Sequence, residues 1–448
     1  MKKDTLSGLD IDLYSEKFSN GFEVYLVPLK NMKRYYATYA TKYGSLITEF
    51  CPNGSRKNVK VPNGIAHFLE HKMFEQESGI DPFSFYSQSG CYVNASTGFE
   101  STRYICSGNT KFRENLDYLL NFVNSPYFTD ENVEKEKGII IEEVNMYKDM
   151  VDSAIDDTTR KCIFQKDHHK YDIGGEVDEV KSITKEDLYS CYDNFYQPNN
   201  MFILIVGNFS VETALDVIRE RVENRENKYK VLPKIKKEKE PYAVAKKCEV
   251  VKFNIDVSKL TYSFKMKKKD FNIQDDYILD LYLAILLKIL FGSTSIFSEK
   301  AKMRDLYSEF YYNFDSTDDY LILNFYGESK KQNELLSFIK ETLFNMLMPY
   351  LSGAIFVDLF SGSGGIGIEA LSRGARKAYF VENSQKAIDC ITDNLQHTHL
   401  NEQAVVVKQD VFAAIRGSIR EDAVDVIFMD PPYDQQYEKR ALEILKDC

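Results

Sequence analysis

The last hundred residues alternate short apolar runs with helical segments, and this order restricts the fold more than any other feature of the chain. Four strands are expected, and a glycine-rich turn follows the first of them. The expected strands are 354–359, 378–381, 404–408 and 424–429, and helices are expected after the turn and over 385–395 and 411–415. A β-α-β-α order of this kind is typical of a parallel, doubly wound sheet. We therefore expect an α/β Rossmann-like core there.

Residues before about 340 have another pattern and composition. Ten alanines occur in residues 1–340 and ten in the last 108, so alanine usage rises about threefold near that point. Alternating apolar residues predict strands at 23–27, 35–39, 201–206 and within 92–106, and helical periodicity predicts helices around 64–76, 112–124, 130–150 and 211–222. This larger part is expected to be an α+β structure.

A charged, proline-marked stretch over 228–241 has no apolar face and predicts a linker. From Cys248 the earlier order begins again, with strands expected at Cys248–Ile255 and Thr261–Met266 and a helix at Tyr277–Phe291, which suggests a degenerate internal repeat. The expected domains are 1–227, a linker at 228–247, a second half at 248–338 and the α/β core at 339–448.

Composition excludes several classes of protein. The chain carries 57 Lys and Arg against 68 Asp and Glu, a net charge of −11, so it has no general attraction to nucleic acid. Its eight cysteines include no C-x-x-C pair, which favours reduced thiols. The most apolar run, Leu281–Phe291, is interrupted by Lys288 and is too short to cross a bilayer. The N-terminus lacks the apolar region of a secretory signal, so we expect a cytoplasmic protein that does not span a membrane.

Two histidines and a glutamate lie close together on one expected helix, in the run His67-Phe68-Leu69-Glu70-His71. Residues four apart share a helix face, so both imidazoles can bind one zinc ion. A carboxylate at Glu70 can take a proton from zinc-bound water and pass it to a leaving amine. Because the chain has only six histidines, a chance match to this spacing is rare. The motif predicts zinc-dependent hydrolysis.

A third zinc ligand is expected from the acidic helix downstream. Glu136 and Glu143 are seven residues apart and therefore project from nearly the same face of that helix. We predict that Glu143 is the ligand. His168 and His169 lie among Lys and Asp residues, where a solvated turn is expected.

The C-terminal turn predicts a nucleotide-like ligand. Gly362, Gly364 and Gly367 form a G-x-G-x-x-G pattern between a strand and a helix, where the backbone can approach a ligand. Glu382 ends the second strand, where a carboxylate can accept both hydroxyls of a ribose. Among the cofactors that use such a turn, S-adenosylmethionine fits best.

The run Asp430-Pro431-Pro432-Tyr433 follows the fourth expected strand. Asp430 and the Pro431 carbonyl can accept hydrogen bonds from an exocyclic amine, and Tyr433 can stack on a base. These residues predict methyl transfer to an amino group.

The metal motif and its flanks resemble the insulinase, pitrilysin and mitochondrial processing peptidase family over about residues 10–340. The matching segments are 64–74, 94–97, 136–143, 195–201 and 206–207. The resemblance implies zinc on His67, His71 and Glu143, Glu70 as general base and Glu136 as a second acid behind the ligands. It also implies that Asn94 and Ala95 lie on an edge strand that pairs with an extended peptide substrate.

The second half departs from this family in two respects. Leu287-Lys-Ile-Leu-Phe-Gly-Ser stands where the first half has its histidines, so the second half is expected to bind no metal. In the family, two halves close over the peptide and an Arg/Tyr pair late in the second half helps to bind it. We find no remainder of that half after about residue 338, so we expect a truncated clamp, which a second peptidase-like chain can complete.

The C-terminal part is similar to bacterial methyltransferases that act on guanine N2 of small-subunit ribosomal RNA, over about residues 339–448. The resemblance implies Asp358, Gly362, Glu382 and Asp410 around the methyl donor and the Asp430–Tyr433 run at the target base. The basic segment before this core and the closing strands after it are missing from the match. Residues 341–448 carry 10 basic against 16 acidic side chains, a net charge of −6, so weak binding to ribosomal RNA is expected.

Three interpretations follow. The first is a zinc metalloendopeptidase joined to an S-adenosylmethionine-dependent methyltransferase core. The second is a chimeric or frameshifted product in which one or both modules are inactive, since both are incomplete at the junction near 338–345. The third is a non-catalytic partner subunit of a peptidase, against which the intact H-x-x-E-H run argues.

Overall fold

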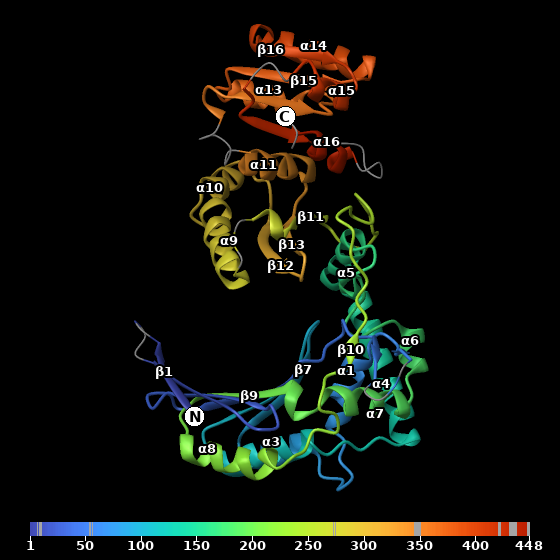
Figure 1. Ribbon diagram of the computed structural model, residues 1–448, viewed down its shortest axis with the longest axis vertical. Coiled ribbons are helices and arrows are strands. Elements are labelled where there is room, and N and C mark those ends of the chain that lie inside the picture. The colour runs from blue at the N-terminus through green and yellow to red at the C-terminus, as the bar shows by residue number, and fades with distance from the viewer. Residues whose placement is uncertain are drawn as a thin grey trace. The chain divides into compact units, whose positions relative to one another are not determined.

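The computed structural model describes residues 1–6, 8, 11–52, 55, 57–271, 273, 275–344, 351–419, 423–429 and 437–445. The chain divides into two compact units, Met1–Phe253 and Asn254–Cys448 (Figure 1). Each unit has its own sheets and its own buried apolar clusters.

The first unit is built on a seven-stranded sheet with the order β1-β2-β3-β9-β4-β8-β7. Its strands are β1 (Lys2–Leu6), β2 (Ile11–Lys17), β3 (Glu23–Pro28), β4 (Tyr35–Thr41), β7 (Tyr92–Thr97), β8 (Thr102–Gly108) and β9 (Met201–Gly207). β3 and β9 run parallel, and the other neighbouring pairs are antiparallel. β9, the last of these strands in the chain, thus lies in the middle of the sheet.

Helices α3 (Phe112–Val123) and α8 (Val211–Ile218) cover one face of this sheet (Figure 1). The short π-helix η3 (Arg219–Glu223) follows α8 directly. Burial alternates along β9, so that every second side chain from Met201 is buried. A half-buried strand requires this period of two. The core is rich in tyrosine, and the buried Tyr104 and Tyr196 hydroxyls pair at 2.9 Å.

The remaining helices of the first unit lie between β4 and β9 in the chain. They are α1 (Ile65–Met73), α2 (Pro82–Gln88), α4 (Asp130–Asp149), α5 (Val151–Ile163), α6 (Val177–Ser182) and α7 (Lys185–Phe195), with short 3-10 turns η1 (His168–Lys170) and η2 (Pro198–Asn200). α4 starts with a reciprocal capping box between Thr129 and Asn132. The helices expected around 64–76, 112–124 and 130–150 are therefore present.

Part of the expected linker packs on the first unit. β10 (Lys234–Ile235) pairs with β5 (Glu49–Cys51), which in turn pairs with β6 (Val59–Lys60). Glu240 is 3% exposed, and its carboxylate accepts the backbone N–H groups of residues 165–167 at 2.7–3.0 Å. A buried carboxylate with three such donors ties this segment down.

The N-terminal part of the second unit holds a three-stranded antiparallel sheet in the order β11-β13-β12. Its elements are β11 (Lys259–Lys267), η4 (Lys268–Asp270), α9 (Asp276–Phe291), α10 (Ile296–Met303), β12 (Glu309–Ser316), β13 (Tyr320–Glu328) and α11 (Gln332–Phe344). The strand predicted at Cys248–Ile255 was wrong: these residues form no strand. Val250 is 79% exposed and Val251 is 51% exposed, so these apolar side chains do not pack on a sheet.

The stretch Asp276–Met303 is long and apolar enough to cross a membrane, judged by length and composition alone. It consists of two helices, because α9 ends at Phe291 and α10 begins at Ile296. Leu283, Leu287 and Phe291 of α9 are buried within this unit. The expectation that the chain does not span a membrane remains a prediction.

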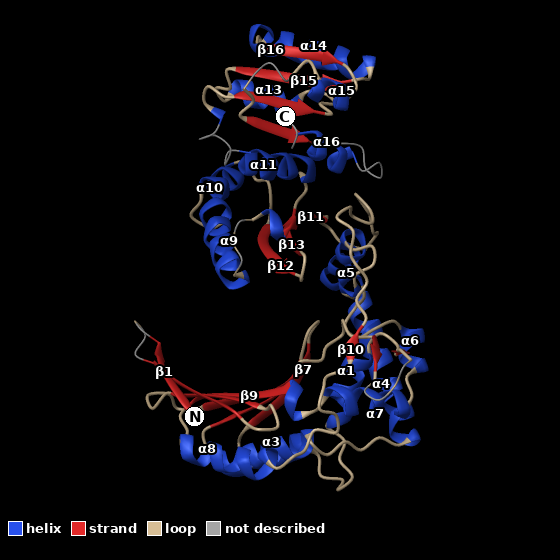
Figure 2. Cartoon of the chain, in the orientation of Figure 1, coloured by secondary structure: helices blue, strands red, loops and turns tan. Residues whose placement is uncertain are grey.

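The C-terminal part of the second unit is a four-stranded parallel sheet in the order β16-β15-β14-β17 (Figure 2). Its elements are β14 (Ile355–Leu359), α13 (Gly365–Ser372), β15 (Lys377–Glu382), α14 (Gln385–Thr398), η6 (Asn401–Gln403), β16 (Ala404–Lys408), α15 (Val411–Arg416), β17 (Val426–Met429) and α16 (Tyr437–Leu445). One apolar cluster includes α13 and α14, and another includes α15 and α16. The predicted parallel sheet is confirmed.

Candidate functional site

The potential metal ligands come from two helices of the first unit. α1 carries His67 and His71, and α4 carries Glu143. One ligand atom of each residue lies within 4.8 Å of the other two. Glu143 Oε2 lies 3.4 Å from His71 Nε2 and 3.9 Å from His67 Nε2. The structure thus brings together the three residues proposed from the sequence as zinc ligands.

The face that α1 turns toward this cluster follows from its sequence. Helical residues advance by about 100° each, so His67, Glu70 and His71 point to one side and Leu69 to the other. Phe68 and Leu69 are fully buried, and burying side chains of this size stabilises the fold by roughly 1.5–3 kcal/mol each. This apolar packing fixes the rotation of α1 about its axis.

Burial controls the protonation of His67. Burial, together with the neighbouring charge of His71, lowers the pKa of His67 to about 4. The imidazole is therefore neutral at pH 7, as a metal ligand must be. Its second ring nitrogen, Nδ1, is buried and has no hydrogen-bond partner in the part of the chain that the structure describes.

Glu136 lies behind His71. Its Oε1 is 3.0 Å from His71 Nδ1, which leaves Nε2 of the same ring toward Glu143. Burial lowers the pKa of His71, but the hydrogen bond and charge of Glu136, with the charges of Glu70 and Glu143, raise it above its ordinary value. Burial also opposes ionisation of Glu136, yet its contact with His71 keeps the pKa of that carboxyl low. A carboxylate in this position orients a metal-binding imidazole and raises its basicity.

Glu70 lies on the same face of α1 and is 9% exposed. Thr97 on β7 donates a hydrogen bond from Oγ1 to Glu70 Oε2 at 2.6 Å. Burial raises the pKa of Glu70, and this outweighs the opposing effects of Thr97 and His71. The contact with Thr97 was not anticipated from the sequence, because a separation of 27 residues in the chain gives no sign of it.

A cleft of about 1130 Å³ opens over these residues. The predicted substrate-binding residues Asn94 and Ala95 line it, on β7, the last strand in the order of the large sheet. Asn94 Nδ2 donates to the Tyr92 hydroxyl at 2.7 Å. Sequence reasoning missed Arg160 and the loop 172–174, which also line the cleft.

The donor set fits zinc. Two imidazole nitrogens and one carboxylate oxygen are a common ligand set of catalytic zinc sites, in which a fourth position stays open for water or substrate. The cleft beside the three groups provides room for both.

The glycine-rich turn of the second unit joins β14 to α13. Asp358 is buried, and its Oδ2 accepts the Gly367 N–H at 3.0 Å. Glu382 Oε2 accepts the Gly362 N–H at 3.0 Å, while Oε1 accepts the next two backbone N–H groups after Glu382. The carboxylate expected to meet ribose hydroxyls therefore also holds the turn.

The three glycines of this turn have different surroundings. A Cβ at Gly367 would lie 2.3 Å from the Phe380 ring, so this position needs glycine for packing. Gly364 has a φ of +76°, which favours glycine, and a Cβ there would lie 3.0 Å from Ile391. Gly362 has a φ of +53°, and a Cβ there would meet nothing within 4 Å. The space beside Gly362 is therefore open, and the Glu382 carboxylate lies next to it.

Of the other residues predicted for this module, the structure describes Asp410 but not the run 430–433. Asp410 caps α15, and its Oδ1 accepts the N–H groups of Phe412 and Ala413 at 3.0 and 3.2 Å. The predicted target-base residues Asp430, Pro431, Pro432 and Tyr433 lie outside the described residues.

Family models match three segments of the chain. Residues 42–176 match insulinase (peptidase family M16), and residues 182–349 match the peptidase M16 inactive domain. The uncharacterized zinc protease YmfH of Bacillus subtilis is 39% identical over 315 residues, which are 69% of this chain and 72% of the relative. The chain belongs to the insulinase family. The resemblance inferred from the sequence is thereby confirmed.

A solved structure agrees with this family. The M16-like peptidase from Alicyclobacillus acidocaldarius superposes on the insulinase-family chain with a TM-score of 0.71 at 28% identity, covering 99% of this chain and 93% of the other. The expected peptidase fold is therefore present.

The C-terminal segment of this insulinase-family chain has different relatives. Residues 335–448 match conserved hypothetical protein 95. Ribosomal RNA small subunit methyltransferase D of Haemophilus influenzae is 38% identical over 108 residues, which are 24% of this chain and 56% of that protein. The chain thus spans just over half the length of this methyltransferase.

Proposed function

We propose that the first unit is a zinc metalloendopeptidase module in which His67, His71 and Glu143 hold the metal and Glu70 is the general base. The observation that carries this proposal is the meeting of these ligands from two helices within 4.8 Å, beside a buried carboxylate in a cleft. Zinc supplies a Lewis acid that lowers the pKa of bound water to about 7.

Glu70 is suited to move a proton at this site. Burial raises its pKa, which brings a carboxylate closer to the operating pH of a general base. The Thr97 hydroxyl donates to Oε2, so we assign to Oε1 the role of accepting the proton and returning it to the leaving amine. Glu136 is the carboxylate that contacts His71 Nδ1 and holds its ring.

The substrate we propose is an extended peptide that pairs with β7. This strand is last in the order of the sheet, and its residues Asn94–Thr97 line the cleft. An edge strand offers backbone groups to an added strand, which supplies affinity without sequence preference. As a partner we propose a second peptidase-like chain, and as location the cytoplasm.

The test combines metal content with cleavage. Purified full-length protein is expected to hold one zinc per chain and to cleave an unstructured peptide in a chelator-sensitive manner. Glu70→Gln is expected to keep the zinc and to lose 10²–10⁴-fold in cleavage rate. Zinc without cleavage in the wild type would point to a non-catalytic subunit or to an incomplete clamp. Folded protein without zinc would contradict the assignment of His67, His71 and Glu143 as zinc ligands.

For the C-terminal module we propose binding of S-adenosylmethionine at the Gly362 turn. The open space at Gly362 favours it, and the methyltransferase relative supports it. Gly362→Ala is expected to weaken binding of S-adenosylmethionine in a calorimetric titration, because the added methyl group enters the ligand's space. Gly353→Ala is the matched control, since its φ of +77° and its empty surroundings are alike. Equal affinities for the two variants would place the ligand elsewhere.

Ribosomal RNA is the methyl acceptor that the relative's name suggests. The net charge of −6 over residues 341–448 opposes binding to its phosphates. We therefore propose methyl-donor binding with weak RNA affinity for this module. The alternative is a chimeric or frameshifted product in which one or both modules are inactive. The zinc and cleavage test examines the peptidase module, and the S-adenosylmethionine titration examines the C-terminal module.

A further inference from the structure

A short loop, Asp172–Glu176, lies between the two helices that carry the metal ligands. A Cβ at Gly174 would lie 3.3 Å from Val144 Cγ2 on α4 and 3.7 Å from His67 Nδ1 on α1. Val144 is the neighbour of Glu143 in the chain. The space beside the α-carbon of Gly174 is therefore bounded by residues of both ligand-bearing helices, α1 and α4.

The same loop lies against the start of α1. A Cβ at Gly64, the residue before the helix, would lie 2.4 Å from the Gly174 carbonyl oxygen, and a Cβ at Gly175 would lie 2.5 Å from the Asn63 carbonyl oxygen. The two backbones touch with no side chains between them. A displacement of the loop therefore displaces the first turn of α1, where His67 lies.

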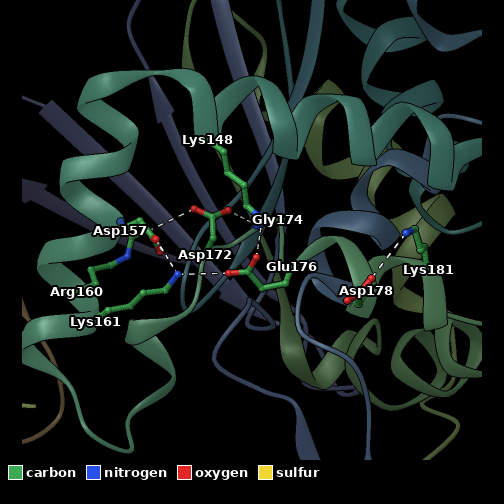
Figure 3. A network of polar contacts seen from close by, with 9 residues as sticks. All are labelled: Lys148, Asp157, Arg160, Lys161, Asp172, Gly174, Glu176, Asp178 and Lys181. Carbon is green, nitrogen blue, oxygen red and sulfur yellow. Dashed lines mark hydrogen bonds and ion pairs between the residues drawn. The ribbon is translucent and has the colours of Figure 1, made fainter. Parts of the chain in front are cut away.

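Ion pairs hold the loop at its first residue (Figure 3). Asp172 Oδ2 accepts a hydrogen bond from the guanidinium of Arg160 on α5 at 3.3 Å, and Asp172 Oδ1 accepts the Gly174 N–H at 2.8 Å. The same Arg160 nitrogen is 3.7 Å from Asp157. One carboxylate thus shapes the loop and fastens it to α5.

A second group of ion pairs holds the other end of the loop (Figure 3). Glu176 pairs with Lys148 of α4 at 2.6 Å and with Lys161 of α5 at 3.3 Å, and Lys161 also pairs with Asp157 at 2.7 Å. Burial opposes ionisation of Glu176, but these lysines keep its pKa below the ordinary value. Both ends of the loop are therefore tied to the α4–α5 pair.

We infer that the Arg160–Asp172 pair is a positioning pair that sets the spacing between His67 and Glu143 through the loop Asp172–Glu176. This inference rests on the proposed zinc site. Neither residue is a ligand: Arg160 acts on Asp172, and Asp172 acts on Gly174. Gly174 in turn lies next to the ligand His67 and next to Val144, the chain neighbour of Glu143. A carboxylate–guanidinium contact can set such a spacing because its geometry is directional.

The test is a double-mutant cycle on zinc affinity in the full-length protein. Asp172→Asn keeps an oxygen for the Gly174 N–H but loses the charge that faces Arg160, and Arg160→Gln removes the other partner. Each variant is expected to lose about tenfold in zinc affinity against a competing chelator, the lower end of the range for groups that orient metal ligands. Combining both changes is expected to add little, because the two residues act through one contact.

A structural readout and a matched control complete the experiment. The absorption spectrum of the Co²⁺-loaded protein reports ligand geometry directly, and it is expected to change in both variants. Arg221→Gln breaks another Arg–Asp pair of the first unit, with Asp117 on α3, and is expected to leave affinity and spectrum unchanged. Circular dichroism of the metal-free variants checks folding.

The outcomes separate this inference from the proposed function. A wild-type chain that binds no zinc overturns the proposed function itself. A wild-type chain that binds zinc, with Asp172→Asn and Arg160→Gln matching it in affinity and spectrum, overturns the positioning role alone. Losses that simply add in the double variant also contradict it, since independent effects mean that the two residues do not act as a pair.

Discussion

The Thr97 hydroxyl donates a hydrogen bond of 2.6 Å to the carboxylate of Glu70, and so joins the outer strand of the large sheet to the proposed general base. The contact would therefore couple the binding of the peptide to the transfer of the proton. The strand that would receive the peptide and the group that would move the proton share one hydrogen bond.

Thr97→Val tests this link. The hydrogen bond lowers the pKa of Glu70 against the raising effect of burial, so its loss is expected to raise that pKa further. A general base works in its ionised form, and the acid limb of kcat/KM against pH should therefore move to higher pH. At pH values below the new limb, kcat/KM of Thr97→Val is expected to be about tenfold lower than that of the wild type at the same pH, since hydrogen bonds to charged groups contribute about 1.5–3 kcal/mol. Thr97→Ser keeps the hydroxyl and should retain the wild-type profile.

Zinc affinity is expected to depend on pH through His71. Burial lowers the pKa of His67 to about 4, whereas the Glu136 contact and neighbouring carboxylates raise that of His71 above its ordinary value. As pH falls, protons therefore compete with zinc at His71 first, and affinity should decline below the raised pKa, long before pH 4. Titration of zinc against a competing dye between pH 5 and 8 measures this.

Glu136→Gln should change that pH dependence in a defined direction. The substitution removes a main cause of the raised pKa of His71, so competition by protons should begin at a lower pH. At pH 8, where protons no longer compete, affinity should still fall about 10- to 100-fold, because the ring loses the carboxylate that orients it. An unchanged affinity at pH 8 would show that Glu136 does not act on the metal through His71.

Glu240 is expected to hold the segment after residue 228 on the first unit. Its buried carboxylate accepts three backbone N–H groups, so Glu240→Ala leaves those donors unpaired and should cost about 3 kcal/mol. Limited proteolysis should then cut within 228–247 many times faster. Glu238 is 58% exposed and lies 3.8 Å from Lys166, so Glu238→Ala is the control and should resist protease like the wild type.

Gly367→Ala is expected to destabilise the parallel sheet. The added methyl carbon would lie 2.3 Å from the Phe380 ring, and overpacking of a core contact costs about 1–3 kcal/mol. Thermal unfolding should show the transition of the second unit at a lower temperature. Adding Phe380→Leu to Gly367→Ala should restore part of the lost thermal stability. Losses of stability that simply add in the double variant would contradict a clash between these two residues.

Local periodicity was sufficient to predict the helices that carry the proposed zinc ligands. His67 and His71 are four residues apart in a segment whose apolar residues recur at helical spacing. Glu143 lies on a long helix with a capping box at its start. The parallel sheet was predictable for the same reason, since strands and helices alternate there at short spacing. Such signals need only neighbours in the chain.

The remaining features depend on contacts between distant segments. Residues 248–255 include the apolar β-branched pair Val250 and Val251, which favours a strand, but the structure assigns no strand there and β11 starts only at Lys259. Arg160 and Asp172 look like ordinary charges in the sequence, and only the fold places them beside the metal ligands. The sequence suggested that Gly364 and Gly367 are glycines because a ligand approaches the turn. The structure shows that the side chains of Ile391 and Phe380 also lie against these two positions.

The position of β9 has a consequence for synthesis of the chain. β9 lies between β3 and β4 and pairs with both, yet it is made after every helix that contributes to the zinc site. Until the ribosome has passed Gly207, β3 and β4 lack the strand that joins them. The sheet whose strands β7 and β8 contact α1 is then unfinished, and α4 in turn packs on α1. The metal site therefore matures late, as a single event at the close of the first unit, and a nascent chain that stops before Met201 should bind no zinc.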